Sequence, residues 1–218
     1  MSKREQILDT ALSLFMEKGF DKTSISEILD ACGIARGTLY YHFISKEAIM
    51  DAIIERSGAA ILAKVEEVLK GKALSSYDKL FLMFRGLNMR SLTGGAQMVD
   101  YLNRPQNALF HEKSNRLVVE KIGPLLTDII RQGTAEGVFD TPYPEDCAEM
   151  ILILAIGFLD QREGGGEEGA QARMGSLFHA VERMLGAEEG SFLRYQERME
   201  SRAPQSKPAQ KTPKARPN

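Results

Sequence analysis

Apolar residues recur at every third or fourth position along most of this chain, which is the pattern of amphipathic α-helices. The first helix is expected to begin after Ser2, because Ser2 and Glu5 match a capping box, and to end at Gly19. Its apolar stripe, with two phenylalanines further along, is expected to form a small core: Ile7, Leu8, Ala11, Leu12, Phe15, Phe20 and Phe43.

Two shorter helices follow around a tight turn. Ser24 and Glu27 form a second capping box, which predicts a helix start directly after Ser24. That helix must stop at Gly33, because glycine supplies the left-handed residue of the turn. Ile34 then fills the core, and the next helix covers about residues 36–41.

A much longer helix is predicted for residues 46–70, with Ser45 as its cap. It would span about 40 Å, so it must belong to both parts of the chain. Further helices are expected at about 77–92, up to 103, at 107–132, 145–162, around 174–185 and at 192–198. Pro124 predicts a kink, residues 163–169 a flexible loop and residues 201–218 a disordered tail. No strand pattern is present, so the fold class is all-α.

The helix at 36–41 is unusual in the side chains that it offers to solvent. They are small, hydroxylated, aromatic or cationic, and only Leu39 is available for packing. Small residues let a helix approach the major groove, and Arg36 can bond guanine through two hydrogen bonds. Threonine can contact a thymine methyl group or a phosphate, and tyrosine can bond a phosphate. These properties are typical of a recognition helix in a helix-turn-helix.

The ordered pattern over residues 4–55 resembles the tetracycline-repressor (TetR) family of bacterial transcription regulators. The residues that carry the resemblance are Ile7-Leu8, Ala11, Leu14-Phe15, Gly19-Phe20, Thr23-Ser24-Ile25, Ile28, Ala31-Cys32-Gly33-Ile34, Gly37-Thr38-Leu39-Tyr40, His42-Phe43 and Ser45-Lys46-Glu47. One departure is Ala35, since this cap position of the recognition helix is usually Ser or Thr in the family. It forfeits about 1 kcal/mol of capping and one possible phosphate contact.

The resemblance implies a three-helix DNA-binding domain over residues 1–46 and a larger helical domain for effector binding and dimerisation over 47–200. Residues 201–218 would be a disordered, basic and proline-rich tail. The lysine at position 46 would hold a DNA phosphate together with the helix N-terminus. The expected DNA-binding residues are Ser24, Ser26, Arg36, Gly37, Thr38, Tyr40, Tyr41, His42 and Lys46.

Charge changes this picture in one respect. The formal net charge is −2, and residues 1–50 carry six basic and seven acidic side chains. DNA affinity must therefore depend on where charges sit rather than on their sum.

The N-terminus lacks the apolar segment of a signal peptide, and no apolar run is long enough to cross a membrane. We therefore expect a cytoplasmic protein that is associated with the bacterial nucleoid when bound to DNA.

Candidate catalytic chemistry is weak. His42, His111 and His179 are far apart in sequence, and no glycine-rich phosphate loop follows a strand. Cys32 and Cys147 have no neighbouring ligands at metal-binding spacing, and we expect both thiols to be free and buried. We therefore predict no enzyme activity, no metal and no cofactor.

Two surfaces of the larger domain are expected to serve regulation. A small-molecule effector would bind among adaptable and polar side chains, although Met and Phe at helical spacing more often fill a core. The residues are Phe84, Asn88, Met98, Tyr101, His111 and Asn115. The last two long helices carry more apolar surface than one layer can cover, which predicts a homodimer. Its interface would contain Ile151, Leu154, Phe158, Met174, Leu177, Phe178, Val181 and Leu185.

The sequence thus predicts a dimeric repressor that binds a palindromic operator in double-stranded DNA and is released by a small, largely hydrophobic effector. The alternative is a helix-turn-helix factor without a small effector, controlled by a protein partner or acting in chromosome organisation.

Overall fold

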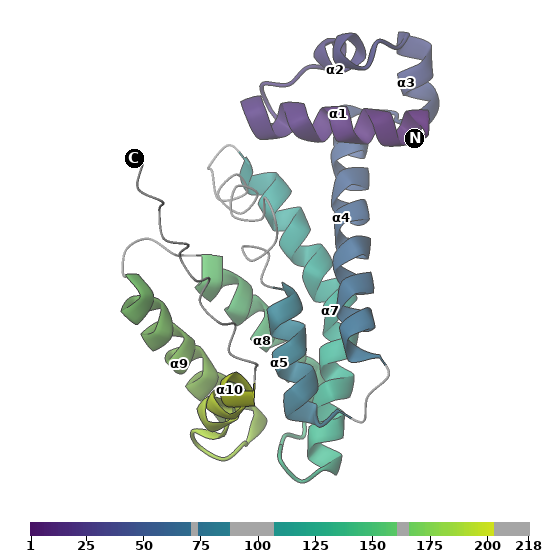
Figure 1. Ribbon diagram of the computed structural model, residues 1–218. Coiled ribbons are helices and arrows are strands. Elements are labelled where there is room, and N and C mark those ends of the chain that lie inside the picture. The colour runs from purple at the N-terminus through teal and green to yellow at the C-terminus, as the bar shows by residue number, and fades with distance from the viewer. Residues whose placement is uncertain (71–73, 88–106, 161–165, 203–218) are drawn as a thin grey trace, which may run out of the picture.

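The computed structural model describes residues 1–70, 74–87, 107–160 and 166–202. These residues form nine α-helices and no strand, which confirms the all-α fold class. In that part of the chain, none of the helices is long and apolar enough to span a membrane. A small N-terminal unit lies on one end of the long helix α4, and the remaining helices form a body along the rest of α4 (Figure 1).

The N-terminal unit consists of α1 (Lys3–Lys18), α2 (Ile25–Cys32) and α3 (Arg36–His42). The predicted helix starts are correct, because the Ser2 hydroxyl accepts a hydrogen bond from the Glu5 amide (3.1 Å) and Ser24 completes a full capping box. The three helices and the first turns of α4 enclose one core, which contains Ile7, Leu8, Ala11, Phe15, Phe20, Ile28, Cys32, Leu39, Phe43, Ile49, Met50, Ile53 and Ile54.

Helix α4 (Lys46–Leu69) joins the two parts of the molecule, as its predicted length required. Its N-terminal half, from Ile49 to Ile54, belongs to the core of the N-terminal unit. Near its C-terminal end, Val65 belongs to the core of the body. Movement of the body relative to the N-terminal unit must therefore act on α4.

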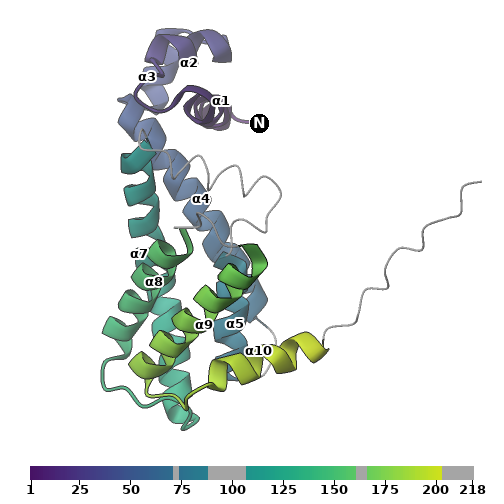
Figure 2. The ribbon, with the colours of Figure 1, turned by 90° about the vertical axis from the view of Figure 1, so that its left-hand side faces the viewer.

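The body contains α5 (Ser76–Leu87), α7 (Ala108–Ala135), α8 (Pro144–Asp160), α9 (Gly166–Leu185) and α10 (Ser191–Arg202) (Figure 2). Helix α7 packs against α4, α5 and α8, so it is the central helix of the body. It continues as one helix through Pro124. The predicted loop at 163–169 is partly wrong, since α9 already begins at Gly166 and the following residues are mainly good helix formers.

The C-terminal helix α10 is held by contacts from distant parts of the chain. The buried Glu182 carboxylate of α9 accepts hydrogen bonds from the backbone amides of Gly190 and Phe192, both at 2.8 Å. Tyr195 stacks on Tyr77 with ring centroids 5.3 Å apart, and its hydroxyl donates to the Asp78 carboxylate. These contacts fix α10 across the N-terminal part of α5.

Candidate nucleic-acid interface

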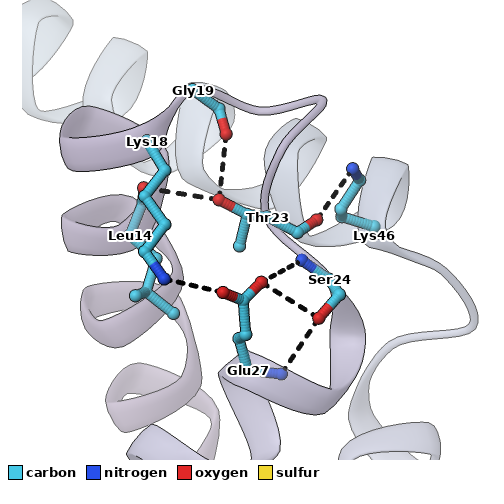
Figure 3. A network of polar contacts seen from close by, with 7 residues as sticks. All are labelled: Leu14, Lys18, Gly19, Thr23, Ser24, Glu27 and Lys46. Atoms are coloured by element: carbon cyan, nitrogen blue, oxygen red, sulfur yellow. Dashed lines mark hydrogen bonds and ion pairs between the residues drawn. The ribbon is translucent and has the colours of Figure 1, made fainter.

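The start of α2 carries a compact polar network (Figure 3). The Ser24 hydroxyl accepts a hydrogen bond from the Glu27 amide (3.2 Å), and the Glu27 carboxylate accepts one from the Ser24 amide (2.8 Å). The Lys18 ammonium group lies 2.6 Å from the same carboxylate. The bond from Lys18, followed by those from Ser24, lowers the pKa of Glu27 from 4.5 to about 2. The carboxylate is therefore ionised and paired at neutral pH.

The segment between α1 and α2 is tied to the N-terminus of α4 by Lys46. Its ammonium group donates to the carbonyl oxygens of Phe20 (2.7 Å) and Thr23 (2.9 Å) and lies 4.2 Å from the centre of the Phe20 ring. The buried Thr23 hydroxyl lies 2.9 Å from the Gly19 carbonyl oxygen and fixes the same segment from inside (Figure 3). Two of the three donors of Lys46 are thus used within the protein, which leaves one for a phosphate.

The turn between α2 and α3 has the predicted geometry. Gly33 is left-handed (φ 62°, ψ 40°), and its amide donates to the carbonyl oxygens at the end of α2. Ala35 has the extended backbone of a helix cap but makes no side-chain hydrogen bond to α3. The helix is instead held by the fully buried side chain of Leu39. One apolar anchor therefore carries α3 and leaves its other faces open.

The open faces of α3 hold most of the predicted DNA-binding residues. Arg36 and Gly37 are exposed, and the exposed fractions of Tyr40 and Tyr41 are 45% and 85%. Their hydroxyl groups are therefore accessible to a phosphate. Thr38 and His42 are half-buried, and the His42 ring lies 5.0 Å from that of Tyr41 in an edge-to-face arrangement.

The two predicted serines occupy different positions. Ser26 is exposed in the first turn of α2. Ser24 is also exposed, but its hydroxyl both accepts from the Glu27 amide and donates to the Glu27 carboxylate (3.0 Å). A phosphate contact by the Ser24 hydroxyl would have to replace the bond to the carboxylate.

Acidic side chains of α1 are directed towards α4 rather than towards α3. The guanidinium group of Arg56 lies 2.8 Å from the carboxylates of both Glu5 and Asp9. With the Lys18–Glu27 pair, this arrangement pairs three of the acidic groups of the N-terminal unit with cations. The near-zero net charge of this unit is therefore compatible with an exposed cation at Arg36.

The predicted effector residues are described only in part. Asn88, Met98 and Tyr101 lie outside the described residues. Phe84 of α5 is half-buried and packs against the core of the body. His111 and Asn115 lie on one face of α7, with the amide nitrogen 3.0 Å from the imidazole Nε2. The structure thus brings His111 and Asn115 together and places Phe84 on a helix that packs against theirs.

The predicted dimer residues need a correction. Five of them, Ile151, Leu177, Phe178, Val181 and Leu185, are buried in the core of the same chain, and Leu154, Phe158 and Met174 pack against it. A fully buried side chain cannot contact a second chain, so these five residues lie on the inner face of their helices. Leu154, Phe158 and Met174 are half-buried and stay predicted interface residues. On the outer face of α8, Met150 and Ile153 are 49% and 55% exposed, so this helix is also not buried all round.

Two further predictions concern metal ions and cysteines. In those parts of the chain no three His, Cys, Asp or Glu side chains are placed to hold a metal ion. Both cysteines are free and buried, as expected. The sequence assigned no site role to two buried positions, Thr23 and Gly58, although Gly58-Ala59-Ala60 is small enough for close packing or a slight bend. A glycine inside a long helix is itself a signal, because it needs a packing reason.

Comparisons with known proteins agree with this geometry. Residues 7–53 match the family described as "Bacterial regulatory proteins, tetR family", and residues 92–163 match "Tetracyclin repressor-like, C-terminal domain". The first match covers α2, α3 and the first third of α4, together with most of α1.

Relatives and solved structures extend the likeness to most of the chain. The transcriptional regulator UidR of Escherichia coli is 28% identical over 187 residues, which cover 81% of this chain and 93% of UidR. The transcriptional repressor KstR2 of Mycobacterium tuberculosis is 27% identical over 144 residues, or 63% of this chain and 70% of KstR2. The crystal structure of RolR with resorcinol superposes with a TM-score of 0.63 at 18% identity and covers 90% of this chain and 93% of RolR. The chain therefore belongs to the TetR family of helix-turn-helix transcriptional regulators.

Proposed function

We propose that this regulator is a homodimeric repressor that reads a palindromic operator with α3 and is released by a small, largely hydrophobic effector. The observation that carries the proposal is the exposure of α3, in which only Leu39 is fully buried and which presents Arg36, Gly37, Tyr40 and Tyr41. One relative, KstR2, is named as a repressor, which favours repression over activation.

Each group on α3 has a chemical role in this proposal. Arg36 reads a guanine through two hydrogen bonds, and Gly37 lets the helix backbone approach the groove. Tyr40 and Tyr41 bond phosphates, while Thr38 contacts a thymine methyl group or a phosphate. Ser26 and the remaining donor of Lys46 add phosphate contacts that set the register of the unit on the duplex.

Dimerisation would place two such units on one face of the duplex. We assign the interface to the outer faces of α8 and α9, where Met150, Ile153 and Gly157 follow one another along α8. On α9 the corresponding positions are Gly175 and His179. A Cβ atom at either glycine would meet nothing within 4 Å in the single chain, so a second chain can approach closely. Two-fold symmetry then requires an operator with two inverted half-sites.

The effector would bind in the body beside α7. His111 and Asn115 provide a polar pair on this helix, and Phe84 of the neighbouring α5 provides an aromatic wall. Such a mixture suits a small, mostly apolar molecule with one or two polar groups. RolR, whose fold this chain shares, binds resorcinol, a molecule of that kind.

The DNA-binding unit in this proposal includes the first turns of α4, up to Ile54.

The test is a selection of binding sites from random duplex DNA. The wild-type protein is expected to enrich two inverted half-sites, and Arg36→Ala is expected to lose about 1–3 kcal/mol of discrimination at one base pair per half-site. Lys22→Ala, which removes an exposed cation between α1 and α2, is the control and should leave the selected sequence unchanged. If Arg36→Ala selects the same sequence as the wild type, Arg36 does not read bases.

The effector part has its own test. A thermal-shift screen with small aromatic and aliphatic compounds should find ligands that raise the melting temperature and release the selected duplex. A compound must prefer the released form, because equal affinity for both forms shifts nothing. Stabilising ligands that leave DNA binding unchanged would favour the alternative of a factor controlled by another protein.

A further inference from the structure

The first turns of α7 have two different faces. Phe110 and Leu117 are buried, with 5% and 7% exposed, and both belong to the core of the N-terminal unit rather than to that of the body. His111 and Asn115, which contact each other, lie on a different face of the same turns. The end of α7 that reaches the N-terminal unit is visible below α1 in Figure 1.

The packing of Leu117 depends on a glycine of α4. A Cβ atom at Gly58 would lie 2.3 Å from Leu117 Cδ2 and 3.1 Å from Leu117 Cγ. Contacts below 3 Å do not occur between such atoms, so alanine at position 58 would force Leu117 to move. Leu117 is buried in the core of the N-terminal unit, and side chains in protein cores are closely packed. Gly58 therefore allows α4 and α7 to approach closely at this point.

A second contact joins the two helices nearer to the DNA-binding surface. The ammonium group of Lys113 pairs with the carboxylate of Asp51. Because this pair is partly exposed, it contributes little to stability but favours one orientation of α7 relative to α4. The ion pair and the contact between Gly58 and Leu117 lie about two turns apart along α4 and fix the distance and the angle between α4 and α7.

We propose that the segment Phe110–Leu117 of α7 is a second support that positions the DNA-binding unit, in addition to α4. The body then acts on the unit through α4 and α7 together, because a tightly packed pair of helices moves as one body. A ligand against His111 and Asn115 presses on the same two turns that enter the core of the DNA-binding unit. The effect of a ligand rests on the proposed effector site, whereas the positioning role of Gly58 and Leu117 does not.

The experiment compares Gly58→Ala, Leu117→Ala and the double variant with the wild type. Gly123→Ala is the matched control, since it adds the same methyl group to a helix interior where a Cβ atom meets nothing within 4 Å apart from its chain neighbours. Because Gly123 precedes Pro124, the melting temperature of this variant reports the local cost of a Cβ atom before proline. Each protein is tested on duplexes that carry the selected half-sites at their native spacing and at spacings shorter or longer by one base pair. Melting temperatures and hydrogen exchange of the α1–α3 amides are measured in parallel.

A repositioned unit changes the preferred spacing, whereas a merely destabilised protein loses affinity on all duplexes equally. For Gly58→Ala we expect the ratio of affinities between the native and the altered spacing to change by roughly tenfold, the range of one modest coupling between sites. The double variant Gly58→Ala/Leu117→Ala should show the same ratio of affinities as Leu117→Ala alone. Gly123→Ala should show the wild-type ratio. A uniform loss on all spacings, or no loss, would overturn the proposal.

The failure of the proposed function gives a different result. If the wild type selects no duplex with two half-sites, the proposed operator is wrong. Hydrogen exchange still tests whether the contact between Gly58 and Leu117 positions the DNA-binding unit. In that case Gly58→Ala should speed exchange of the α1–α3 amides about tenfold or more relative to Gly123→Ala, with reversal in the double variant. Equal exchange rates in Gly58→Ala and Gly123→Ala would overturn the positioning role of Gly58 and Leu117, whatever the DNA result.

Discussion

The N-terminal unit and the body differ in how their helices are fixed. In the N-terminal unit the helix starts are marked by serines a few residues away, such as Ser24 and Ser45. In the body, α10 is held by the Glu182 carboxylate of another helix and by Tyr195 against Asp78, more than a hundred residues away. The first unit is specified by local chemistry and the second by packing between distant segments.

The two regions also differ in the surface that they leave open. The N-terminal unit exposes mainly groups that can form hydrogen bonds, with Ile44 as a single exposed aliphatic side chain, whereas α8 of the body exposes the aliphatic side chains of Met150 and Ile153 together. Met150 and Ile153 are three residues apart on α8, so they lie side by side, and the proposed dimer interface would cover both. The body is therefore the part of the molecule that a second chain would complete.

The largest effect is expected from a charge on that face. Ile153→Glu would bury an unpaired carboxylate in the proposed dimer interface, so we expect a monomer that keeps its helical content. Loss of the paired second half-site contact should weaken binding to the selected duplex on the order of 100-fold. Light scattering and titration with the duplex measure the two effects.

Leu193→Glu is the matched control for this variant. Leu193 is 43% exposed on α10, close to the value for Ile153, but lies on another helix. It should leave the oligomeric state unchanged. A monomeric Leu193→Glu, or a dimeric Ile153→Glu, would move the interface away from α8 and remove this difference between the two regions.

A smaller effect is expected from Lys46→Ala in the N-terminal unit. The variant leaves two carbonyl groups without a charged donor, which should lower the free energy of unfolding by about 1.5–3 kcal/mol. DNA affinity should fall about equally for all sequences, and the salt slope should fall by about one or less. Chemical denaturation and binding at several salt concentrations separate these terms. Unchanged stability together with a salt slope lower by one would assign Lys46 to DNA rather than to the fold.

The same difference explains what could be predicted from the sequence. The caps at Ser2 and Ser24 and the turn at Gly33 are local patterns, so helix bounds and the exposed side of α3 followed from them. The inner and outer sides of α8 did not, because the run from Met150 to Leu159 is apolar all round and carries no periodicity. Which residues of α7 join which core could not be predicted either, since that depends on how two distant helices cross. Lys46 shows a third limit, because a cation suited to a phosphate is also suited to a carbonyl.

The side-chain cap that α3 lacks should change the free energy of unfolding by about 1 kcal/mol when it is supplied. Ala35 has the extended backbone (φ −70°, ψ 150°) that a capping residue adopts, so Ala35→Ser should stabilise the N-terminal unit by about 1 kcal/mol. The control is Ala31→Ser, on the exposed side of α2, where serine should lower stability by about 0.5 kcal/mol. Thermal denaturation of both variants gives the comparison, and a stabilising effect of the same size at position 31 would contradict a cap at position 35.

The smallest effect concerns the dependence of the N-terminal unit on pH. The pKa of Glu27 is lowered from 4.5 to about 2, chiefly by Lys18 and then by Ser24. A carboxyl group whose pKa is lower in the folded state contributes stability above its unfolded pKa and loses that contribution as pH falls through the folded value. The contribution of Glu27 should therefore be complete above about pH 4.5 and disappear towards pH 2.

Two variants isolate this contribution from the other carboxylates. Lys18→Met removes the largest cause, so a carboxyl NMR titration should show the midpoint of Glu27 move upwards from about 2 towards 4.5. In Glu27→Gln the amide oxygen can still accept from the Ser24 amide, so the difference in melting temperature from the wild type should shrink as pH falls from 4.5 towards 2. Since the pair is exposed, both differences should also shrink in high salt. A Glu27 midpoint that does not respond to Lys18→Met would mean that the Ser24 cap alone holds the carboxylate, and that the first helix contributes nothing to the start of the second.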